Sequence, residues 1–305
     1  MTAFSTSAVN SVFSIIILLS GMFLMVLIMH LLLKYRDHTV KLPVDREQLL
    51  RIPAFSLQNQ IQDLQFDLVS SLTMAVMVVS FPFAVESIES HISQNTFPYT
   101  FTFIAIIGLT YCGYKTWKNF SKLTKLRLGH TAEIATANEL IGLQALGYQI
   151  FHDIQADGFN IDHLAIGKNG VFAIETKGRH KRHKDHTQPN QNGSKGYELF
   201  YKDGRLHFPS WVETKPLEQA TRQAKWVSQW LTKATGEQIF SSPVLVFPGW
   251  YVTSQTRPPF PIINHKQLVK TLPSVRTQSL SQQQVDAIVY QVAQRCLSKI
   301  IPKSD

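Results

Sequence analysis

The stretch NIDHLAIGKNGVFAIETK, residues 160–177, predicts the central element of the fold. Two short apolar runs flank the turn 167–170, whose sequence Gly-Lys-Asn-Gly is a strong signal for a β-hairpin. Because side chains alternate between the two faces of a strand, we expect Asp162, Glu175 and Lys177 on one face of this hairpin. The apolar residues beside them are typical of a protein core, so the three charged groups should lie at its edge.

The sequence leaves two registers of this hairpin open. If the turn is centred on its Lys-Asn pair, Asp162 lies opposite Glu175; if it is centred on its Asn-Gly pair, Asp162 lies opposite Lys177. Facing Cβ atoms are about 5 Å apart, so two carboxylates there repel each other, and burial raises the pKa of one of them. Oxygen ligands in this arrangement suit Mg²⁺, and the lysine could stabilise a hydroxide or the charge on a phosphate. The alternative is an ion-paired cluster on a solvated sheet face.

Helices and strands are expected to alternate on both sides of the hairpin. The other predicted elements are a helix at 131–146, a strand at 148–154, a hairpin at 197–208, a helix at 216–234, a strand at 243–252 and a helix that starts at 281. This order predicts an α/β fold in which helices flank a mixed central sheet. The two cysteines are too few for a disulfide framework or a cysteine-rich zinc module.

The first third of the chain has a different pattern. Three apolar runs, 12–33, 68–85 and 97–114, contain no Asp, Glu, Lys or Arg and predict membrane-spanning helices. Basic residues follow the first and third runs, whereas the loop 86–96 has none. This asymmetry predicts a multi-pass protein of a bacterial inner membrane, with the N-terminus outside, residues 115–305 in the cytoplasm and the lipid bilayer as a partner. For the second and third runs, the alternative is a pair of buried core helices.

Charge is unevenly distributed along the chain. The net charge is −2 over residues 1–114 and +11 over residues 115–305. A basic region of this kind suits an anionic lipid surface or a polyanion such as nucleic acid, and charge alone does not separate the two. Transport is disfavoured, because the predicted spans contain no charged side chains.

Four segments, in sequence order, resemble the nuclease-related domain (NERD) family, a branch of the PD-(D/E)xK nuclease superfamily. These segments are Gly129–Glu133, Asn160–Leu164, Gly170–Gly178 and Pro216–Ala220. The resemblance implies a PD-(D/E)xK nuclease-like fold for this part of the chain, and the apolar runs predict three transmembrane α-helices before it. Together with the apolar runs and the charge pattern, it predicts a membrane region at 1–114, a basic linker at 115–128, a nuclease-related domain at 129–272 and a C-terminal helix at 273–305.

The resemblance also implies roles for individual residues. Asp162 and Glu175 would hold a metal ion, with Glu133 as a further acidic ligand, either directly or through water. Lys177 would orient or activate water, and Gln219 would support the site or contact the phosphate backbone. The implied cofactor is Mg²⁺, with Mn²⁺ as a second option.

The segment after the lysine departs from the family. Members commonly have aromatic and glycine residues there, whereas here Gly178 leads into a loop rich in Lys, Arg and His. Its basic residues could neutralise phosphate charge, or the loop could be flexible and solvated. The candidate contacts are Arg179, Lys181, Arg182 and Lys184. The histidines of this loop, His180, His183 and His186, lack the fixed spacing of a helical metal motif. Trp211, Trp226 and Trp230 could stack on bases, although the last two have a spacing more typical of helix packing.

The function expected from these features is a membrane-anchored, Mg²⁺-dependent nuclease-like domain that hydrolyses phosphodiester bonds of DNA or RNA at the cytoplasmic face. The alternative is a catalytically inactive module that binds nucleic acid or a protein partner at the membrane.

Overall fold

The computed structural model describes residues 24–25, 27–36, 38–39, 43–45, 48–89, 99–182, 185 and 196–297. The chain divides into two compact units, the first formed by residues 1–45 and 62–123 and the second by residues 46–61 and 124–305. Unit 2 is therefore assembled from two separate stretches of the chain. It contains all the labelled strands, and each unit is described by itself below.

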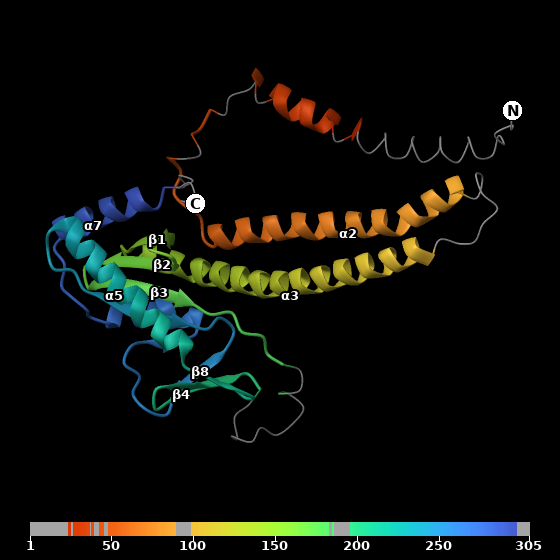
Figure 1. The fold of residues 1–305 in the computed structure, drawn as a ribbon. Helices are drawn as coiled ribbons and strands as arrows, with labels where there is room; N and C mark the ends of the chain where they lie inside the picture. The colour runs from red at the N-terminus through yellow and green to blue at the C-terminus, as the bar shows by residue number, and fades with distance from the viewer. Residues whose placement is uncertain are drawn as a thin grey trace, which may run out of the picture. The chain divides into compact units, whose positions relative to one another are not determined.

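The named helices and strands are drawn in Figure 1, which labels some of them. They are α2 (Phe55–Glu89), α3 (Tyr99–Gln144), β1 (Gln149–Gln155), β2 (Asn160–Gly167), β3 (Gly170–Thr176), β4 (Glu198–Lys202), β5 (Arg205–His207), β6 (Val212–Glu213), α5 (Lys215–Thr235), β7 (Ser241–Val246), β8 (Tyr251–Ser254), β9 (Ile262–Ile263), η2 (His265–Gln267), α6 (Leu268–Thr271), η3 (Leu272–Ser274) and α7 (Gln282–Arg295).

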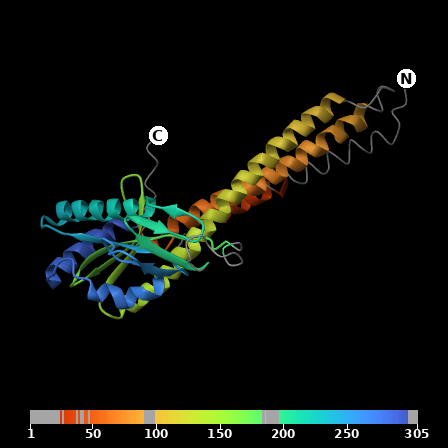
Figure 2. The ribbon, with the colours of Figure 1, turned by 90° about the horizontal axis from the view of Figure 1, so that it is seen from below.

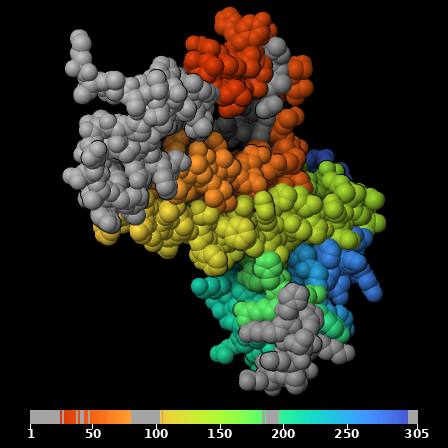
Figure 3. Space-filling model, turned by 90° about the vertical axis from the view of Figure 1, so that its right-hand side faces the viewer, coloured from red at the N-terminus to blue at the C-terminus, as the bar shows by residue number. Residues whose placement is uncertain are grey.

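In unit 1, α2 and α3 run side by side (Figures 1 and 3). They approach closely at Gly108, where an added Cβ would lie only 2.7 Å from a methyl group of Val78. Large apolar side chains of these helices remain exposed among the described residues, for example Phe66 (74%) and Trp117 (73%). The large apolar clusters of buried residues are all in unit 2.

The predicted location in a membrane is wrong, because no helix formed by the described residues is both long and apolar enough to cross a bilayer. The two later apolar runs are only parts of much longer helices. The first turns of α2 are rich in Gln and Asp, and α3 continues past its apolar start into a lysine-rich stretch. Of the first predicted span, residues 12–23 lie outside the described residues.

Helix α3 joins three segments that the sequence treats separately. It contains the third apolar run, the expected basic linker 115–128 and the first helix expected in the nuclease-related domain. The boundary between the two units falls inside α3, between residues 123 and 124. Gly129 does not interrupt the helix, and it faces Leu57, whose Cδ1 would lie 3.3 Å from an added Cβ.

The main sheet of unit 2 has the strand order β1-β2-β3-β7-β9. The first three strands are antiparallel, and the pairs β3–β7 and β7–β9 are parallel, so the predicted mixed sheet is confirmed. Helices α5 and α7 cover one face of this sheet, through Val227, Leu231, Ile288 and Val292 among others. The C-terminal part of α3 and α6 cover the other face, through Leu140, Leu143 and Leu268. Figure 2 shows this sheet between its helices.

A second sheet, with the order β6-β5-β4-β8, extends unit 2. The predicted hairpin at 197–208 is confirmed as β4 and β5, and both turn residues, Asp203 and Gly204, have positive φ, as a tight hairpin requires. The strand predicted at 243–252 is in fact two strands in different sheets, β7 and β8. The cause is a turn at Pro248-Gly249, where Gly249 has φ +77° and the Trp250 amide donates to the Phe247 carbonyl.

The helix expected at 131–146 does not begin at Thr131, because α3 runs through this position. The predicted limits of α5 and the predicted start of α7 are confirmed. Helix α5 has Pro in its first turn and ends at Gly236, which adopts φ +75° and donates its amide to Thr232. Helix α7 starts with the predicted capping box, in which Ser281 and Gln284 bond each other's backbone amides. Both helices are thus fixed by local sequence as well as by packing.

The C-terminal segment is an integral part of the sheet unit. Asn169, in the β2–β3 turn, accepts a hydrogen bond from the Tyr148 hydroxyl (2.7 Å) and donates to the carbonyls of Leu272 (2.9 Å) and Val275 (2.7 Å). Gly170 has φ +135°, and an added Cβ would lie 2.8 Å from the Thr277 side chain. The hairpin turn and the segment before α7 are therefore held together closely.

We expect Asn169→Ala to lower the free energy of unfolding by about 2–3 kcal/mol, because it removes three side-chain hydrogen bonds. Urea denaturation measures this change. Lys168→Ala, at the exposed neighbouring position, is the control and should shift stability by no more than about 0.5 kcal/mol. Equal stabilities of the two variants would contradict the anchoring role.

Candidate active site

The β2–β3 hairpin has the first of the two predicted registers. The pairs run from Gly167–Gly170 to His163–Ile174, which places Asp162 opposite Glu175. Beyond His163 the backbone ladder ends, and the Thr176 amide donates instead to Oδ2 of Asp162 (2.7 Å). The side chain of Asp162 therefore replaces the backbone as the partner that closes this end of the hairpin.

Glu175 and Lys177 form an ion pair at the end of β3, between Oε1 and Nζ. The Glu175 side chain is almost fully buried (1% exposed), whereas that of Lys177 is 20% exposed. Oε2 of Glu175 is also buried, and it has no hydrogen-bond partner among the described residues. This buried oxygen is therefore available as a ligand.

Glu133 reaches the same place from α3. Thr136, one turn further along α3, lies 3.2 Å from Thr176 through the two hydroxyl groups. The chain passes so close to α3 after Lys177 that a Cβ on Gly178 would lie 2.8 Å from the Leu128 carbonyl oxygen. Only glycine fits this approach without a shift of backbone.

The pKa values of the acids show that their charges interact. Burial, followed by the charges of Asp153 and Glu175, raises the pKa of Glu133 to about 8, and Lys177 opposes the increase. Burial, followed by the charges of Glu175 and Glu133, raises the pKa of Asp162 well above its ordinary value. Lys177 and the Thr176 amide lower it only in part. The structure thus brings together the four charged residues that the sequence singles out in this hairpin and helix.

Asp153 is a fifth charged residue near the site, and the sequence analysis missed it. It lies in β1 between His152, which pairs with His163, and Ile154, which pairs with Ile161, so its register position is opposite Asp162. Its φ is +50°, an uncommon backbone conformation for an aspartate, and it is 4% exposed.

Four donors hold the Asp153 carboxylate. They are Arg51 Nη1 (3.3 Å), the Ser56 amide (3.2 Å), the Ser56 hydroxyl (2.6 Å) and Asn160 Nδ2 (3.0 Å). Arg51 is itself buried and anchored, because its amide donates to the carbonyl of Cys296. About one hundred residues separate Asp153 from Arg51 and Ser56, so no local pattern could have revealed this network.

The two glutamines of α5 differ in their contacts. Gln219, which the family resemblance singled out, is half-buried, and its side chain makes no hydrogen bond among the described residues. Gln223 is fully buried, and its Nε2 donates to the Asn160 carbonyl (3.0 Å). Gln223 therefore connects α5 to the network around Asp153.

The loop after Gly178 is attached to the second sheet. Arg179 binds both carboxylate oxygens of Glu213 (2.8 and 2.9 Å), so its charge is already paired. Lys181 and Arg182 are exposed, and they lie over the rings of Trp250 and Trp211 at 5.7 and 4.8 Å from the centroids. His180 is exposed, whereas Lys184, His183 and His186 lie outside the described residues.

The tryptophans considered for base stacking are packed against protein. Trp211 stacks on Phe208 with a centroid distance of 4.3 Å. Trp226 and Trp230 stack on each other at 5.3 Å, and the Arg295 guanidinium lies about 5 Å from both rings. Packing accounts for all three residues.

Across the described ranges, no group of three or more His, Cys, Asp or Glu side chains is arranged to hold a metal ion. Two carboxylates nevertheless have the chemistry for a hard cation. Glu175 offers its unpartnered Oε2. Burial, followed by the charges of Glu175 and Glu133, raises the pKa of Asp162, and a cation beside it would stabilise its carboxylate form. Mg²⁺ needs only one or two protein carboxylates, because water and substrate complete its coordination.

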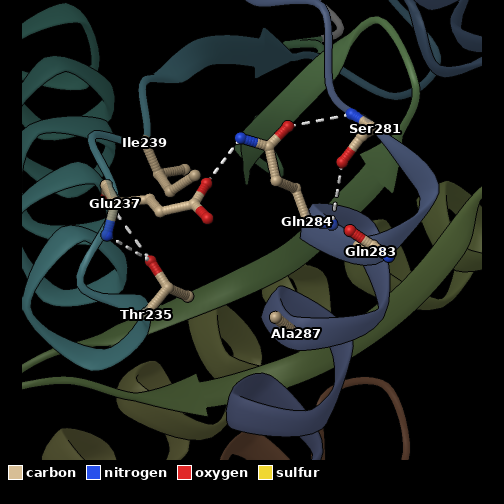
Figure 4. Close-up of a pocket in the computed structure, with 7 residues that line it drawn as sticks. All are labelled: Thr235, Glu237, Ile239, Ser281, Gln283, Gln284 and Ala287. Atoms are coloured by element: carbon tan, nitrogen blue, oxygen red, sulfur yellow. Dashed lines mark hydrogen bonds between the residues drawn. The ribbon is translucent and has the colours of Figure 1, made fainter.

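Figure 4 shows a hollow of about 330 Å³ between the end of α5 and the start of α7. Its polar side chains bond to one another: Gln284 donates to Glu237 (2.5 Å), and Thr235 accepts from the Glu237 amide (3.3 Å). None of the charged residues at the end of β3 lines it, so this hollow is separate from the candidate site.

A family model described as "NERD: Nuclease-related domain" matches residues 128–248. The matched segment starts five residues before Glu133 and ends just after β7, so it contains every site residue that the sequence predicted. It leaves out Arg51, Ser56 and α7. No curated protein and no solved structure matches the chain.

Glu133 makes the stability of the protein dependent on pH. Its pKa is about 8 in the folded state and near 4.5 in an unfolded chain, so between these values the folded protein keeps a proton that the unfolded chain loses. Stability should therefore fall as pH rises from about 5 to 8, by at most roughly 5 kcal/mol for this group. We expect Glu133→Gln to make this fall shallower, because glutamine stays neutral.

Urea denaturation at intervals from pH 5 to 8 in EDTA measures the difference. Glu218→Gln, at an exposed position on α5, is the matched control and should follow the wild type. Glu133→Gln also removes one of the charges that raise the pKa of Asp162, so the difference between the two curves reports on both groups. Parallel curves for wild type and Glu133→Gln would show that Glu133 is not buried beside the other carboxylates.

We expect Arg51→Leu to lower the free energy of unfolding by about 3–5 kcal/mol, because it leaves the buried Asp153 without its cation. Arg276→Leu, at an exposed arginine of unit 2, should cost no more than about 0.5 kcal/mol. The same denaturation experiment compares them. A small effect of Arg51→Leu would mean that residues 46–61 do not support the site.

Proposed function

We propose that this chain is a metal-dependent nuclease that hydrolyses phosphodiester bonds of DNA or RNA, with its active centre at the end of β3. The match of residues 128–248 to the nuclease-related domain supports a nuclease-related function. The observation that carries the proposal is the meeting of Asp162, Glu133 and Glu175 beside Lys177, where one buried carboxylate oxygen has no partner.

In the proposal, Asp162 and Glu175 hold one divalent cation, Mg²⁺ or Mn²⁺. The unpartnered Oε2 of Glu175 and an oxygen of Asp162 would be its protein ligands. When bound, such an ion polarises the scissile phosphate and lowers the pKa of a coordinated water. Glu133 is the candidate for a further contact, direct or through water.

The other residues would orient the substrate and handle its charge. Lys177 carries a partly exposed cation beside Glu175, where it can stabilise negative charge on a phosphate oxygen or a hydroxide. Without a bound cation, burial and the charges of Asp153 and Glu175 raise the pKa of Glu133 to about 8, so a cation at this place would favour the carboxylate form that can act as a ligand. The Thr176 amide fixes the orientation of Asp162.

A second candidate function is binding of nucleic acid without hydrolysis. It is favoured by the ion pair of Glu175 with Lys177, which already neutralises one carboxylate without a metal. It is also favoured by the lack of a three-residue metal site among the described residues. This candidate requires salt-sensitive binding, no metal requirement and no product.

We expect the full chain to cut labelled nucleic acid in Mg²⁺ or Mn²⁺ and to be inactive in EDTA. Asp162→Asn and Lys177→Ala should each lower the cleavage rate by about 100-fold or more, because one removes a ligand charge and the other removes the cation at the reacting phosphate. Gel assays with single- and double-stranded DNA and RNA measure the rate.

Lys168→Ala, an exposed lysine in the β2–β3 turn, is the control and should cut like the wild type. Circular dichroism establishes that all the variants are folded. Equal cleavage by the wild type and both site variants would refute the proposed catalytic roles. Binding by the wild type without any cleavage under these conditions would favour the second candidate function.

A further inference from the structure

One face of helix α5 is buried in the core, and the opposite face is exposed to solvent. The buried face consists of Pro216, Leu217, Ala220, Gln223, Ala224, Val227 and Leu231. Its apolar residues pack on the main sheet and on the second cluster of unit 2. The helix is therefore held firmly, and its opposite face points to solvent.

The solvent face of α5 is strongly basic. Its exposed charged residues are Lys215, Arg222, Lys225 and Lys233, with Glu218 as the single acid among them. At 3.6 residues per turn, these positions fall on one side of the helix, opposite the buried side chains. From the first cation to the last, the row extends for about 27 Å. Figures 1 and 2 show α5 on the outside of the main sheet.

The four cations of this row are available to a partner. Elsewhere in unit 2, the described ion pairs join Arg51 to Asp153, Lys177 to Glu175, Arg179 to Glu213 and Arg295 to Asp157. None of the four cations on α5 takes part in a described ion pair. Arg222 has one protein contact for its guanidinium, over the ring of Phe159 at 5.4 Å.

The row begins close to the candidate active site. Glu213, two residues before Lys215, binds Arg179, which is two residues after Lys177. In the middle of the helix, Gln223 donates to the Asn160 carbonyl, and the Asn160 side chain binds Asp153. Helix α5 is thus tied to the site at its start and again near its centre.

We infer that the solvent face of α5 binds the sugar–phosphate backbone of a nucleic acid and guides the strand toward Lys177. A row of lysine and arginine along one helix is the electrostatic footprint of polyanion binding. The nearby aromatic residues Phe159, Trp226 and Trp230 contact one another or arginines, so they do not offer free rings to bases. The contact would therefore be independent of sequence. This inference rests on the proposed function in naming nucleic acid as the partner.

The test measures binding separately from hydrolysis. Fluorescence anisotropy of a labelled single strand of roughly 20 nucleotides is recorded in EDTA at several salt concentrations. The double variant Lys225→Glu/Lys233→Glu should bind at least about tenfold more weakly at low salt. The slope of log K against log salt should become shallower by about 1–2, because two phosphate contacts are lost.

Two matched controls isolate the position from the charge. Lys266→Glu/Lys270→Glu makes the same charge change at exposed lysines of η2 and α6, near the opposite face of the main sheet, and should bind like the wild type. Lys225→Arg/Lys233→Arg keeps the charge on α5 and should also bind like the wild type. Circular dichroism checks that all variants are folded.

Weaker binding only for the α5 reversal supports the inference. An equal loss for both charge reversals shows a general charge effect and overturns the inference. Unchanged binding of the Lys225→Glu/Lys233→Glu variant also overturns it, and so does a wild type that does not bind. A wild type that binds through α5 but does not cut in Mg²⁺ or Mn²⁺ leaves this inference standing and refutes only the proposed hydrolysis.

Discussion

The repulsion among buried carboxylates is the constraint that organises unit 2. Glu133, Asp162 and Glu175 come from a helix and two strands, and burial and mutual repulsion raise the pKa of the first two. One lysine and one backbone amide offset this repulsion only in part. A core that keeps such a cluster gives up stability that apolar residues would have supplied. This loss of stability has a functional reason if the cluster binds a cation, because a bound cation would reduce the repulsion between the carboxylates.

The sequence predicted the hairpin well because its information is local. A turn of Gly-Lys-Asn-Gly between apolar runs predicts two strands, and alternation then places Glu175 and Lys177 two residues apart on one face. The sequence left two registers of the hairpin open, because both place Asp162, Glu175 and Lys177 on the same face. The hydrogen bond of the Thr176 amide to Asp162 is a tertiary detail of the strand end, and it accompanies the register with Asp162 opposite Glu175.

Long-range partners were beyond the reach of the sequence. Nothing near Asp153 shows that its carboxylate meets Arg51 and Ser56, or that its backbone takes a positive φ. The family resemblance led to Gln219, whereas the depth of burial on α5, which sequence spacing alone does not give, makes Gln223 the residue that contacts the network. The membrane prediction failed for a related reason. It treated each apolar run by itself, but the second and third runs are parts of longer helices that also contain polar turns.

The charge balance of the site therefore depends on residues that the matched segment does not contain. The match begins at residue 128, yet Arg51 supplies the cation for Asp153, and Asp153 contributes to the raised pKa of Glu133. Residues 46–61 cluster with unit 2, and Leu50 forms a β-bridge to Leu297 just after α7. A segment cut at the limits of the match would keep every acid of the cluster and lose one of its two paired cations. In such a fragment the carboxylates would repel one another more strongly, because Asp153 would lack the cation that Arg51 supplies in unit 2.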